Sequence, residues 1–269
     1  MNRFKRMLGI AAMLVTALVW VQPASAQQDN LVDQIKKRGK LQVGFSSFVP
    51  WAMRDKQGQW VGFEVDVATK LAKDLGVQLE LMPTAWDGII PSLISSKFDV
   101  IIGGMSVTPA RLEQIDFTEA YSTSGQGVAA SKKLAAKLKW PEEYNNSNVT
   151  FTCRRGATPC KLIEEKWPKA NLRQFDDDAI AFQEVINGNA HATISSEPKP
   201  TFFALKNPDT LFKPTQEKLA GSYEGFGVRK GNKAALATFN EWIAKNKDFL
   251  AARHKYWFGS QEWTALVPS

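Results

Sequence analysis

Three short apolar runs, LQVGF at 41–45, VQLELM at 77–82 and FDVIIG at 98–103, set the architecture of this chain. Between the first two runs, residues 64–75 carry apolar side chains three or four positions apart, and Gly76 follows as a helix stop. Residues 87–96 form a second helical segment before the third run. Strands that alternate with helices in this way predict a parallel sheet covered on both faces, with ligands bound at the carboxyl ends of its strands.

The alternation restarts after a Ser- and Gly-rich segment at 122–127, and a Gly-rich extended stretch at 221–228 later leads to two closing helices. Two Gly-rich crossings on either side of an inserted α/β lobe are typical of a hinge, because glycine absorbs large changes in φ and ψ. We therefore expect four parts after the N-terminus: a large lobe from 27–124 plus 225–269, a small inserted lobe from 129–220, and hinge crossings at 125–128 and 221–224.

The N-terminus has the three parts of a secretory signal peptide. Arg3, Lys5 and Arg6 form its positive start, an apolar run extends from 7 to 21, and Ala24-Ser25-Ala26 provides the cleavage site. The apolar run is short for a membrane span, and no comparable run follows it in the sequence. We therefore expect residues 1–26 to be removed and a periplasmic mature protein of 243 residues (269 minus 26).

Charge and cysteine content restrict the partners of the mature protein. Its formal charge is about +4, since three of the +7 charges lie in the expected signal peptide, and no Lys/Arg tract contains interleaved aromatic residues. We therefore expect no nucleic-acid partner. No histidine or cysteine spacing is typical of zinc, so we expect no metal and no other cofactor. Cys153 and Cys160 are expected to form a disulfide in an oxidising compartment.

The segment Gly103–Arg111 has features of a carboxylate receptor. Thr108 suits a helix N-cap and Pro109 the first helical position, but Arg111 stands where a capping box would place Glu or Gln. The helix start would then keep free N–H groups beside a guanidinium, a combination that binds carboxylates. From the spacing alone, a surface arginine on a short helix is the alternative.

Three aromatic residues, Phe48, Trp51 and Trp86, lie at strand ends rather than within helical stripes. Aromatic rings in such positions enclose the apolar part of a small ligand or face a cation. From the residues alone, packing in the core is the competing interpretation for each of them.

Several motifs follow one another along the chain: LQVG (41–44), VGFEVD (61–66), WDGIIPSL (86–93), FDVIIGGM (98–105), TPAR (108–111), DFTEAY (116–121) and KYWFG (255–259). In this order they resemble the family 3 solute-binding proteins of polar amino-acid ABC importers, from about Leu41 to Gly259. The resemblance implies an α/β, two-lobed periplasmic-binding-protein fold, each lobe a mainly parallel sheet flanked by helices, joined by a two-strand hinge. It also implies a protein, expected to be a monomer, that captures a small amino acid or related carboxylate and delivers it to an inner-membrane ABC permease.

The resemblance also implies the ligand contacts: Arg111 for the α-carboxylate, Gly104 and Ser106 for the α-ammonium, Phe48, Trp86 and the less closely matched Trp51 for the side chain, and Ala157 and Thr158 of the small lobe for further carboxylate contacts. Two positions depart from the pattern. Ser196 stands where many relatives carry an Asp that pairs with the α-ammonium. Three interpretations are open: Glu197 binds the ammonium instead, the ammonium is bound more weakly, or the ligand is not a standard α-amino acid. Phe45 stands roughly where relatives that bind ligands with basic or amide side chains often carry Asp. A buried ligand cation would lack its partner here, which favours a neutral ligand.

Some relatives of this fold are enzymes, notably periplasmic cyclohexadienyl dehydratases, in which a Gly-Gly-Thr loop precedes a catalytic acid. The comparable run here is Gly156–Cys160, with Cys160 at the position of the acid. A disulfide sulfur cannot donate a proton as a carboxylic acid does, so we expect no enzymatic activity. A ligand-sensing domain that docks a receptor is the other alternative.

Overall fold

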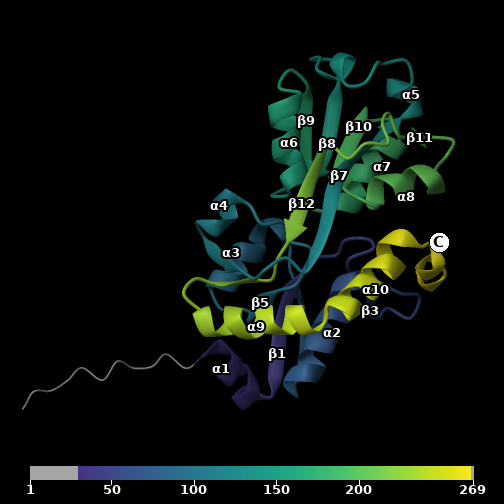
Figure 1. Ribbon diagram of the computed structural model, residues 1–269. Coiled ribbons are helices and arrows are strands. Elements are labelled where there is room, and N and C mark those ends of the chain that lie inside the picture. The colour runs from purple at the N-terminus through teal and green to yellow at the C-terminus, as the bar shows by residue number, and fades with distance from the viewer. Residues whose placement is uncertain (1–29, 268–269) are drawn as a thin grey trace, which may run out of the picture.

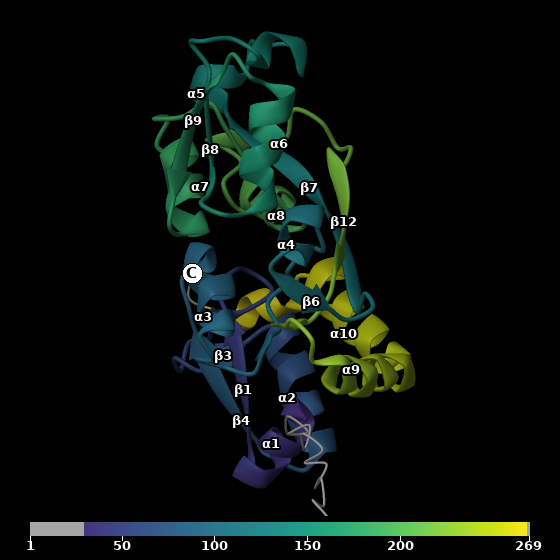
Figure 2. The same ribbon diagram turned by 90° about the vertical axis from the view of Figure 1, so that its left-hand side faces the viewer.

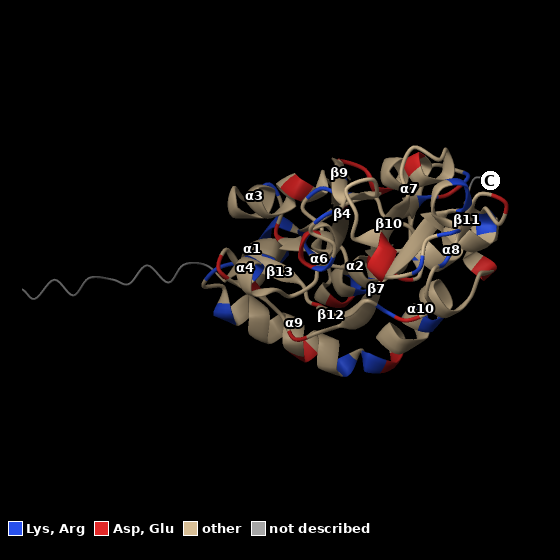
Figure 3. Cartoon of the chain, turned by 90° about the horizontal axis from the view of Figure 1, so that it is seen from above, with Lys and Arg blue, Asp and Glu red and all other residues tan. Residues whose placement is uncertain are grey.

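Two α/β lobes, one above the other in Figure 1, make up the protein in a computed structural model that describes residues 30–267. The expected signal peptide, 1–26, lies outside the described residues. Within 30–267, no helix combines the length and the apolar character that crossing a bilayer requires. Seen from above, acidic and basic residues are interspersed along the outer helices (Figure 3).

The sheet of the first lobe has the order β4-β1-β5-β13-β6. β1 is parallel to both β4 and β5, whereas β13 is antiparallel to its two neighbours. The strands expected from the three apolar runs therefore form the parallel part of this sheet, although the third is shorter than expected. The bounds are β1 (Lys40–Phe45), β4 (Gln78–Pro83), β5 (Val100–Ile101), β6 (Ile115–Phe117) and β13 (Gly227–Arg229), with a separate hairpin of β2 (Met53–Arg54) and β3 (Trp60–Val61).

Helices cover this sheet, and capping residues delimit the first two. Asn30 accepts a hydrogen bond from the backbone N–H of Val32 at the start of α1, and left-handed Gly39 and Gly76 end α1 and α2. Figure 1 shows α9 and α10 crossing this lobe. The bounds are α1 (Leu31–Arg38), α2 (Phe63–Leu75), a 3₁₀ turn (Trp86–Gly88), α3 (Ile89–Ile94), α4 (Pro109–Leu112), α9 (Lys233–Lys245), α10 (Lys247–Gly259) and a final 3₁₀ turn (Glu262–Leu266).

The second lobe is a sheet of order β11-β7-β10-β8-β9, to which β12 is added along β7. β8 is parallel to β9 and β10, and β7 is antiparallel to its partners. The strand bounds are β7 (Ser122–Ser131), β8 (Thr150–Arg154), β9 (Asn171–Phe175), β10 (Ala192–Ser196), β11 (Leu211–Phe212) and β12 (Ala220–Glu224). The helix bounds are α5 (Lys132–Ala135), a 3₁₀ turn (Glu142–Tyr144), α6 (Thr158–Lys166), α7 (Asp178–Ile186) and α8 (Lys199–Lys206).

The two crossings between the lobes are β7 and β12, which pair antiparallel from Ser122 opposite Glu224 to Gln126 opposite Ala220. Figure 2 shows them side by side on one edge of the molecule. Away from these strands the lobes also touch, because Phe202 of α8 stacks on Trp263 with ring centroids 4.8 Å apart. The lobes are therefore held against each other on two sides of the space between them.

Each lobe has its own apolar core. In the first, Val43, Leu71 and Phe239 are fully buried between the sheet and its helices. In the second, Phe151 and Ile194 are fully buried together with Cys153, which is joined to Cys160 by a disulfide. Separate cores leave the interface between the lobes free to carry polar groups, as a binding cleft requires.

Candidate ligand-binding site

A cavity of about 20 Å³ lies where the two lobes meet. It is lined by residues of the first lobe, Phe48, Trp86, Gly104, Ser106 and Arg111, and by residues of the second, Arg154, Ala157, Thr158, Pro159, Asp178, Ser195 and Ser196. Of the ten ligand contacts expected from the sequence, the structure brings eight to this one place. Trp51 and Glu197 are not among the lining residues.

Arg111 reaches across the boundary between the lobes. Its Nη1 donates to the carbonyl oxygen of Ser106 at 2.8 Å, and its Nη2 donates to the carbonyl oxygen of Gly156 in the other lobe at 3.2 Å. The residue is 9% exposed. Burial, and to a lesser degree the charge of Arg154, lower its pKa to about 10, so the guanidinium stays protonated at neutral pH. Among residues 30–267, no carboxylate forms an ion pair with Arg111.

The helix that carries Arg111 differs from the expectation in one respect. Thr108 and Pro109 take the predicted N-cap and first helical positions, but α4 is a single turn. The hydroxyl of Thr108 accepts a hydrogen bond from the backbone N–H of Arg111 at 3.3 Å. The helix start is therefore not left with all its donors free.

Gly104 is held by a buried chain of hydrogen bonds behind the cavity. Its N–H donates to the hydroxyl of Tyr121 at 3.1 Å, and that hydroxyl donates to the carboxyl group of Glu64 at 2.7 Å. Burial raises the pKa of Glu64 to about 8, against the lowering effect of the Tyr121 hydrogen bond. Glu64 is therefore neutral at pH 7, and it adds no negative charge to the site.

Trp51 packs behind Gly104 rather than lining the cavity. It is 2% exposed, and its ring centroid lies 4.6 Å from those of both Phe48 and Phe258. Gly104 has φ of +66°, and a Cβ atom there would lie 2.6 Å from Cδ1 of Trp51. Trp51 thus supports the backbone of the site, which agrees with the core interpretation left open for it, and Gly104 has both conformational and steric reasons to be glycine.

The loop of the second lobe closes the cavity from the other side. Gly156 has φ of +73°, and Ala157 precedes α6, whose first residue, Thr158, accepts a hydrogen bond from Nε2 of Gln126 at 2.9 Å. The start of α6 faces the cavity and adds a partial positive charge. The Cys153–Cys160 disulfide joins the end of β8 to α6 and so encloses this loop.

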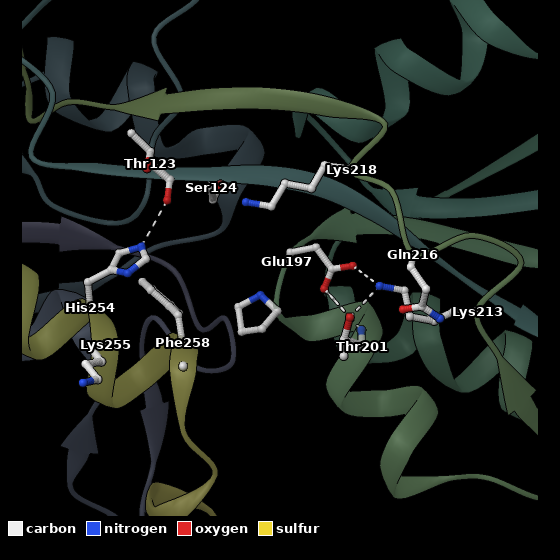
Figure 4. Close-up of a pocket in the computed structure, with 12 residues that line it drawn as sticks. Thr123, Ser124, Glu197, Thr201, Lys213, Gln216, Lys218, His254, Lys255 and Phe258 are labelled. Carbon is white, nitrogen blue, oxygen red and sulfur yellow. Dashed lines mark hydrogen bonds and ion pairs between the residues drawn. The ribbon is translucent and has the colours of Figure 1, made fainter.

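Glu197 is not positioned to replace the Asp that Ser196 lacks. Its carboxylate lies 2.6 Å from Nζ of Lys213 and accepts a hydrogen bond from the hydroxyl of Thr201 at 2.8 Å (Figure 4). It lines a larger pocket of about 560 Å³ beside His254 and Phe258 of α10. The ion pair with Lys213 stabilises this orientation, which turns the carboxylate away from the cavity that contains Arg111.

Two charged residues at the cavity, Arg154 and Asp178, were missed by the sequence analysis. Arg154 is the last residue of β8. Asp178 is the third of three consecutive aspartates, and it is 2% exposed, whereas Asp177 caps α7. Their sequence signal was their position at the ends of elements, Arg154 at the end of β8 and Asp178 at the start of α7, but charged residues at element ends are ordinarily solvated.

Comparisons with known proteins agree with this architecture. L-cystine-binding protein TcyJ of Escherichia coli (strain K12) is 30% identical over 257 residues, which cover 94% of this chain and 95% of that protein. The crystal structure of an ancestral amino acid-binding protein, AncCDT-1, described as a precursor of cyclohexadienyl dehydratase, is 36% identical and superimposes with a TM-score of 0.77 over 85% of this chain and 99% of its own.

An enzyme is also among the relatives, since cyclohexadienyl dehydratase of Pseudomonas aeruginosa is 24% identical and covers 90% of this chain and 92% of its own length. The sequence profile of the bacterial extracellular solute-binding proteins, family 3, matches residues 41–260. That span includes the whole second lobe, most of the first lobe and every residue that lines the cavity. The chain therefore belongs to family 3 of the bacterial extracellular solute-binding proteins.

Proposed function

We propose that this protein captures a small amino acid or related carboxylate between its lobes and delivers it to an ABC permease of the inner membrane. Arg111 carries this proposal, because its guanidinium is buried at the lobe boundary and, among residues 30–267, has no carboxylate partner. A buried cation without a counter-charge is costly, and a ligand carboxylate removes that cost.

Closure of the lobes is part of the same mechanism. Arg111 and the aromatic residues belong to the first lobe, and the Gly156–Thr158 loop belongs to the second, so a ligand in the cavity contacts both. Contacts made only when the lobes are together stabilise the closed form. The hinge crossings at 125–128 and 221–224 lie within or beside β7 and β12, where a change in backbone angles would reorient one lobe against the other.

We propose a binding role without catalysis, although a dehydratase is among the relatives. The side chain at the position expected for a catalytic acid is Cys160, which is bonded to Cys153. Incubation of the protein with prephenate or arogenate tests this directly. Formation of phenylpyruvate or phenylalanine at a rate proportional to protein concentration would show that the chain is an enzyme.

A ligand screen tests the binding function. The mature protein is unfolded by heat in the presence of each common amino acid and small carboxylate, and a true ligand raises the midpoint with its concentration. Calorimetry then measures the affinity of each ligand found. If no amino acid and no carboxylate stabilises the protein, the proposed function is wrong. N-terminal sequencing of the exported protein and its size in solution test cleavage after Ala26 and the expected monomer.

A further inference from the structure

Arg154 occupies the space between the two aromatic walls of the cavity. Its guanidinium carbon lies 4.6 Å from the ring centroid of Phe48 and 4.5 Å from that of Trp86. It extends from the second lobe, at the end of β8, toward rings of the first lobe, and it is 5% exposed. The resemblance to the family assigned this space to the side chain of the ligand, so here a cation of the protein is part of that subsite.

The donors of Arg154 are poorly satisfied by the protein. Nη1 is 3.5 Å from both the hydroxyl of Ser46 and the carbonyl oxygen of Ser47, which is the outer limit of a hydrogen bond. Nε is buried, and no atom of residues 30–267 accepts a hydrogen bond from it. Buried guanidinium donors without acceptors are costly, and an anion beside Arg154 would supply those acceptors.

The other charges at the cavity do not neutralise Arg154. Asp178 lies 2.5 Å from Nζ of Lys199, and both side chains are almost fully buried, so this carboxylate already has a cation. Burial lowers the pKa of Arg154, and the charges of Asp178 and Asp177 only partly oppose this effect. Asp178 is paired with Lys199, and the other two charged residues that line the cavity, Arg111 and Arg154, are both cations, so positive charge is in excess there.

We propose that the ligand carries two carboxylates, one bound by Arg111 and the second bound by Arg154, which thereby determines specificity. This inference rests on the proposed function, and it names the ligand class. An apolar ligand side chain would leave the donors of Arg154 as poorly satisfied as before, a neutral amide would offer only one uncharged acceptor oxygen, and a cationic side chain would add to the positive charge. A dicarboxylate neutralises both guanidiniums and offers each a bidentate partner.

This proposal differs from the expectation of a neutral ligand, which nothing in the structure tests. That expectation rested on Phe45, which does not line the cavity but packs against Trp60 with ring centroids 4.7 Å apart. The absence of a carboxylate at that position therefore carries little information about the charge of the ligand.

The nearness of both guanidiniums to one ring favours a short chain between the two carboxylates. The guanidinium carbons of Arg111 and Arg154 lie 5.6 Å and 4.5 Å from the centroid of the same ring, that of Trp86. A cavity of about 20 Å³ holds little more than a water molecule, so such a ligand must also displace Arg154 from between the rings or hold the lobes further apart. A dicarboxylate with a backbone of four or five carbons is of the right class.

Two classes of ligand carry two carboxylates: acidic amino acids, and dicarboxylic acids without an amine. Calorimetric titration of the mature protein with L-aspartate, L-glutamate, succinate and glutarate separates them, and L-asparagine, L-glutamine and L-lysine are the neutral and cationic comparisons. We expect at least one dicarboxylate to bind about 10- to 100-fold more tightly than its amide, the difference that charge-assisted hydrogen bonds ordinarily make.

Variants of Arg154 test whether this residue causes the preference for dicarboxylates over their amides. Arg154→Gln should reduce the ratio of dicarboxylate to amide affinity to within about twofold. Arg154→Lys, which keeps the charge but loses the planar fork, should retain part of the preference. The control is Arg155→Gln, because Arg155 is exposed and pairs with Asp176 outside the cavity, and it should leave the ratio unchanged. Thermal unfolding of each variant establishes that it is folded before titration.

The possible outcomes separate this inference from the proposed function. If a neutral or cationic amino acid binds more tightly than every dicarboxylate and still requires Arg111, Arg154 does not select the ligand and the inference is wrong, while the binding function stands. If the dicarboxylate preference survives in Arg154→Gln, the second carboxylate lies elsewhere and the inference is also wrong. If neither amino acids nor carboxylates bind, both proposals fail.

Discussion

The carboxylate of Asp178 and the ammonium of Lys199 form an ion pair inside the second lobe, with 2.5 Å between Oδ2 and Nζ. Their side chains are 3% and 2% exposed, and the hydroxyl of Ser195 donates to the same carboxylate at 3.1 Å. Lys199 also lies 5.0 Å from the ring centroid of Phe48 in the first lobe. The pair therefore links the core of the second lobe to the aromatic wall of the cavity.

Removing one partner of this pair should destabilise the protein more than removing both. Asp178→Asn leaves the Lys199 ammonium buried without a counter-charge, so we expect it to lower the free energy of unfolding by about 3–5 kcal/mol. The double variant Asp178→Asn, Lys199→Met should lose less than Asp178→Asn alone. Urea denaturation of the parent, Asp178→Asn, Lys199→Met and the double variant measures these values. A loss in the double variant equal to the sum of the two single losses would show that the two groups do not depend on each other.

An exposed pair provides the control for that experiment. Lys161 and Glu165 lie one helical turn apart on α6, with 3.7 Å between Nζ and Oε1, and both are more than half exposed. Such pairs contribute little, because water and salt screen them. Glu165→Gln should therefore leave the urea midpoint where it is in the parent protein.

Arg111→Ala should abolish most ligand binding and leave the fold intact. The substitution removes the guanidinium that would face the ligand carboxylate, and an unpaired buried charge costs about 3–5 kcal/mol, which corresponds to roughly 10²- to 10³-fold in affinity. Calorimetry with the tightest ligand of the screen measures the change. If the variant binds that ligand as well as the parent does, the carboxylate of the ligand is bound elsewhere.

Regular elements of this chain could be predicted from the sequence because local patterns determine them. Asn30 and Gly39 delimit α1, Gly76 ends α2, and Thr108 with Pro109 starts α4, as their capping preferences indicate. These residues act on their own neighbours in the chain. Their effect can therefore be read without knowledge of the tertiary structure.

The charged groups of the site could not be predicted in the same way. Arg154 and Phe48 are more than a hundred positions apart, and only the meeting of two lobes brings the guanidinium to the ring. Asp178 is indistinguishable in sequence from its neighbour Asp177, and burial against Lys199 alone separates a capping residue from an ionic core residue. Likewise, the contact of Glu197 with Lys213 depends on how the segment after β11 folds back. Such long-range pairings have no local signal.

The stability of the protein should fall as the pH rises through the range in which Glu64 is protonated in the folded state but ionised in the unfolded state. A glutamate in the unfolded chain ionises near pH 4.5, whereas burial raises the pKa of Glu64 in the folded protein to about 8. Between these values the folded state holds a proton that the unfolded state has released. The contribution of Glu64 to the free energy of unfolding is thus complete below pH 4.5. It is lost between pH 4.5 and pH 8, by up to about 1.4 kcal/mol per pH unit.

Glu64→Gln isolates this contribution, because glutamine has nearly the same shape and does not ionise. The difference in free energy of unfolding between the parent and this variant, measured in urea at pH 5, 6.5 and 8, should shift steadily in favour of the variant. Ionisable groups that both proteins share, including His191 and His254, cancel in the difference. A difference that is constant with pH would mean that Glu64 is ionised in the folded protein.

The disulfide between Cys153 and Cys160 should stabilise the fold modestly and the site more strongly. Because the two cysteines are separated by seven positions in the sequence, restriction of the unfolded chain accounts for about 2–3 kcal/mol. The double variant Cys153→Ser, Cys160→Ser should therefore melt roughly 5–10 °C below the parent. A reductant that lowers the midpoint of the parent to that of the variant would attribute the whole change to the bond.

The bond also encloses Arg154 and Gly156, which contact the first lobe through the Phe48 ring and through Arg111. If it holds this loop in position for the ligand, the double serine variant will bind more weakly even at a temperature where it is fully folded, because ordering the loop then costs conformational entropy on binding. If the bond is only a structural staple, affinity at that temperature will equal that of the parent. Calorimetry of both proteins at 15 °C decides between these roles.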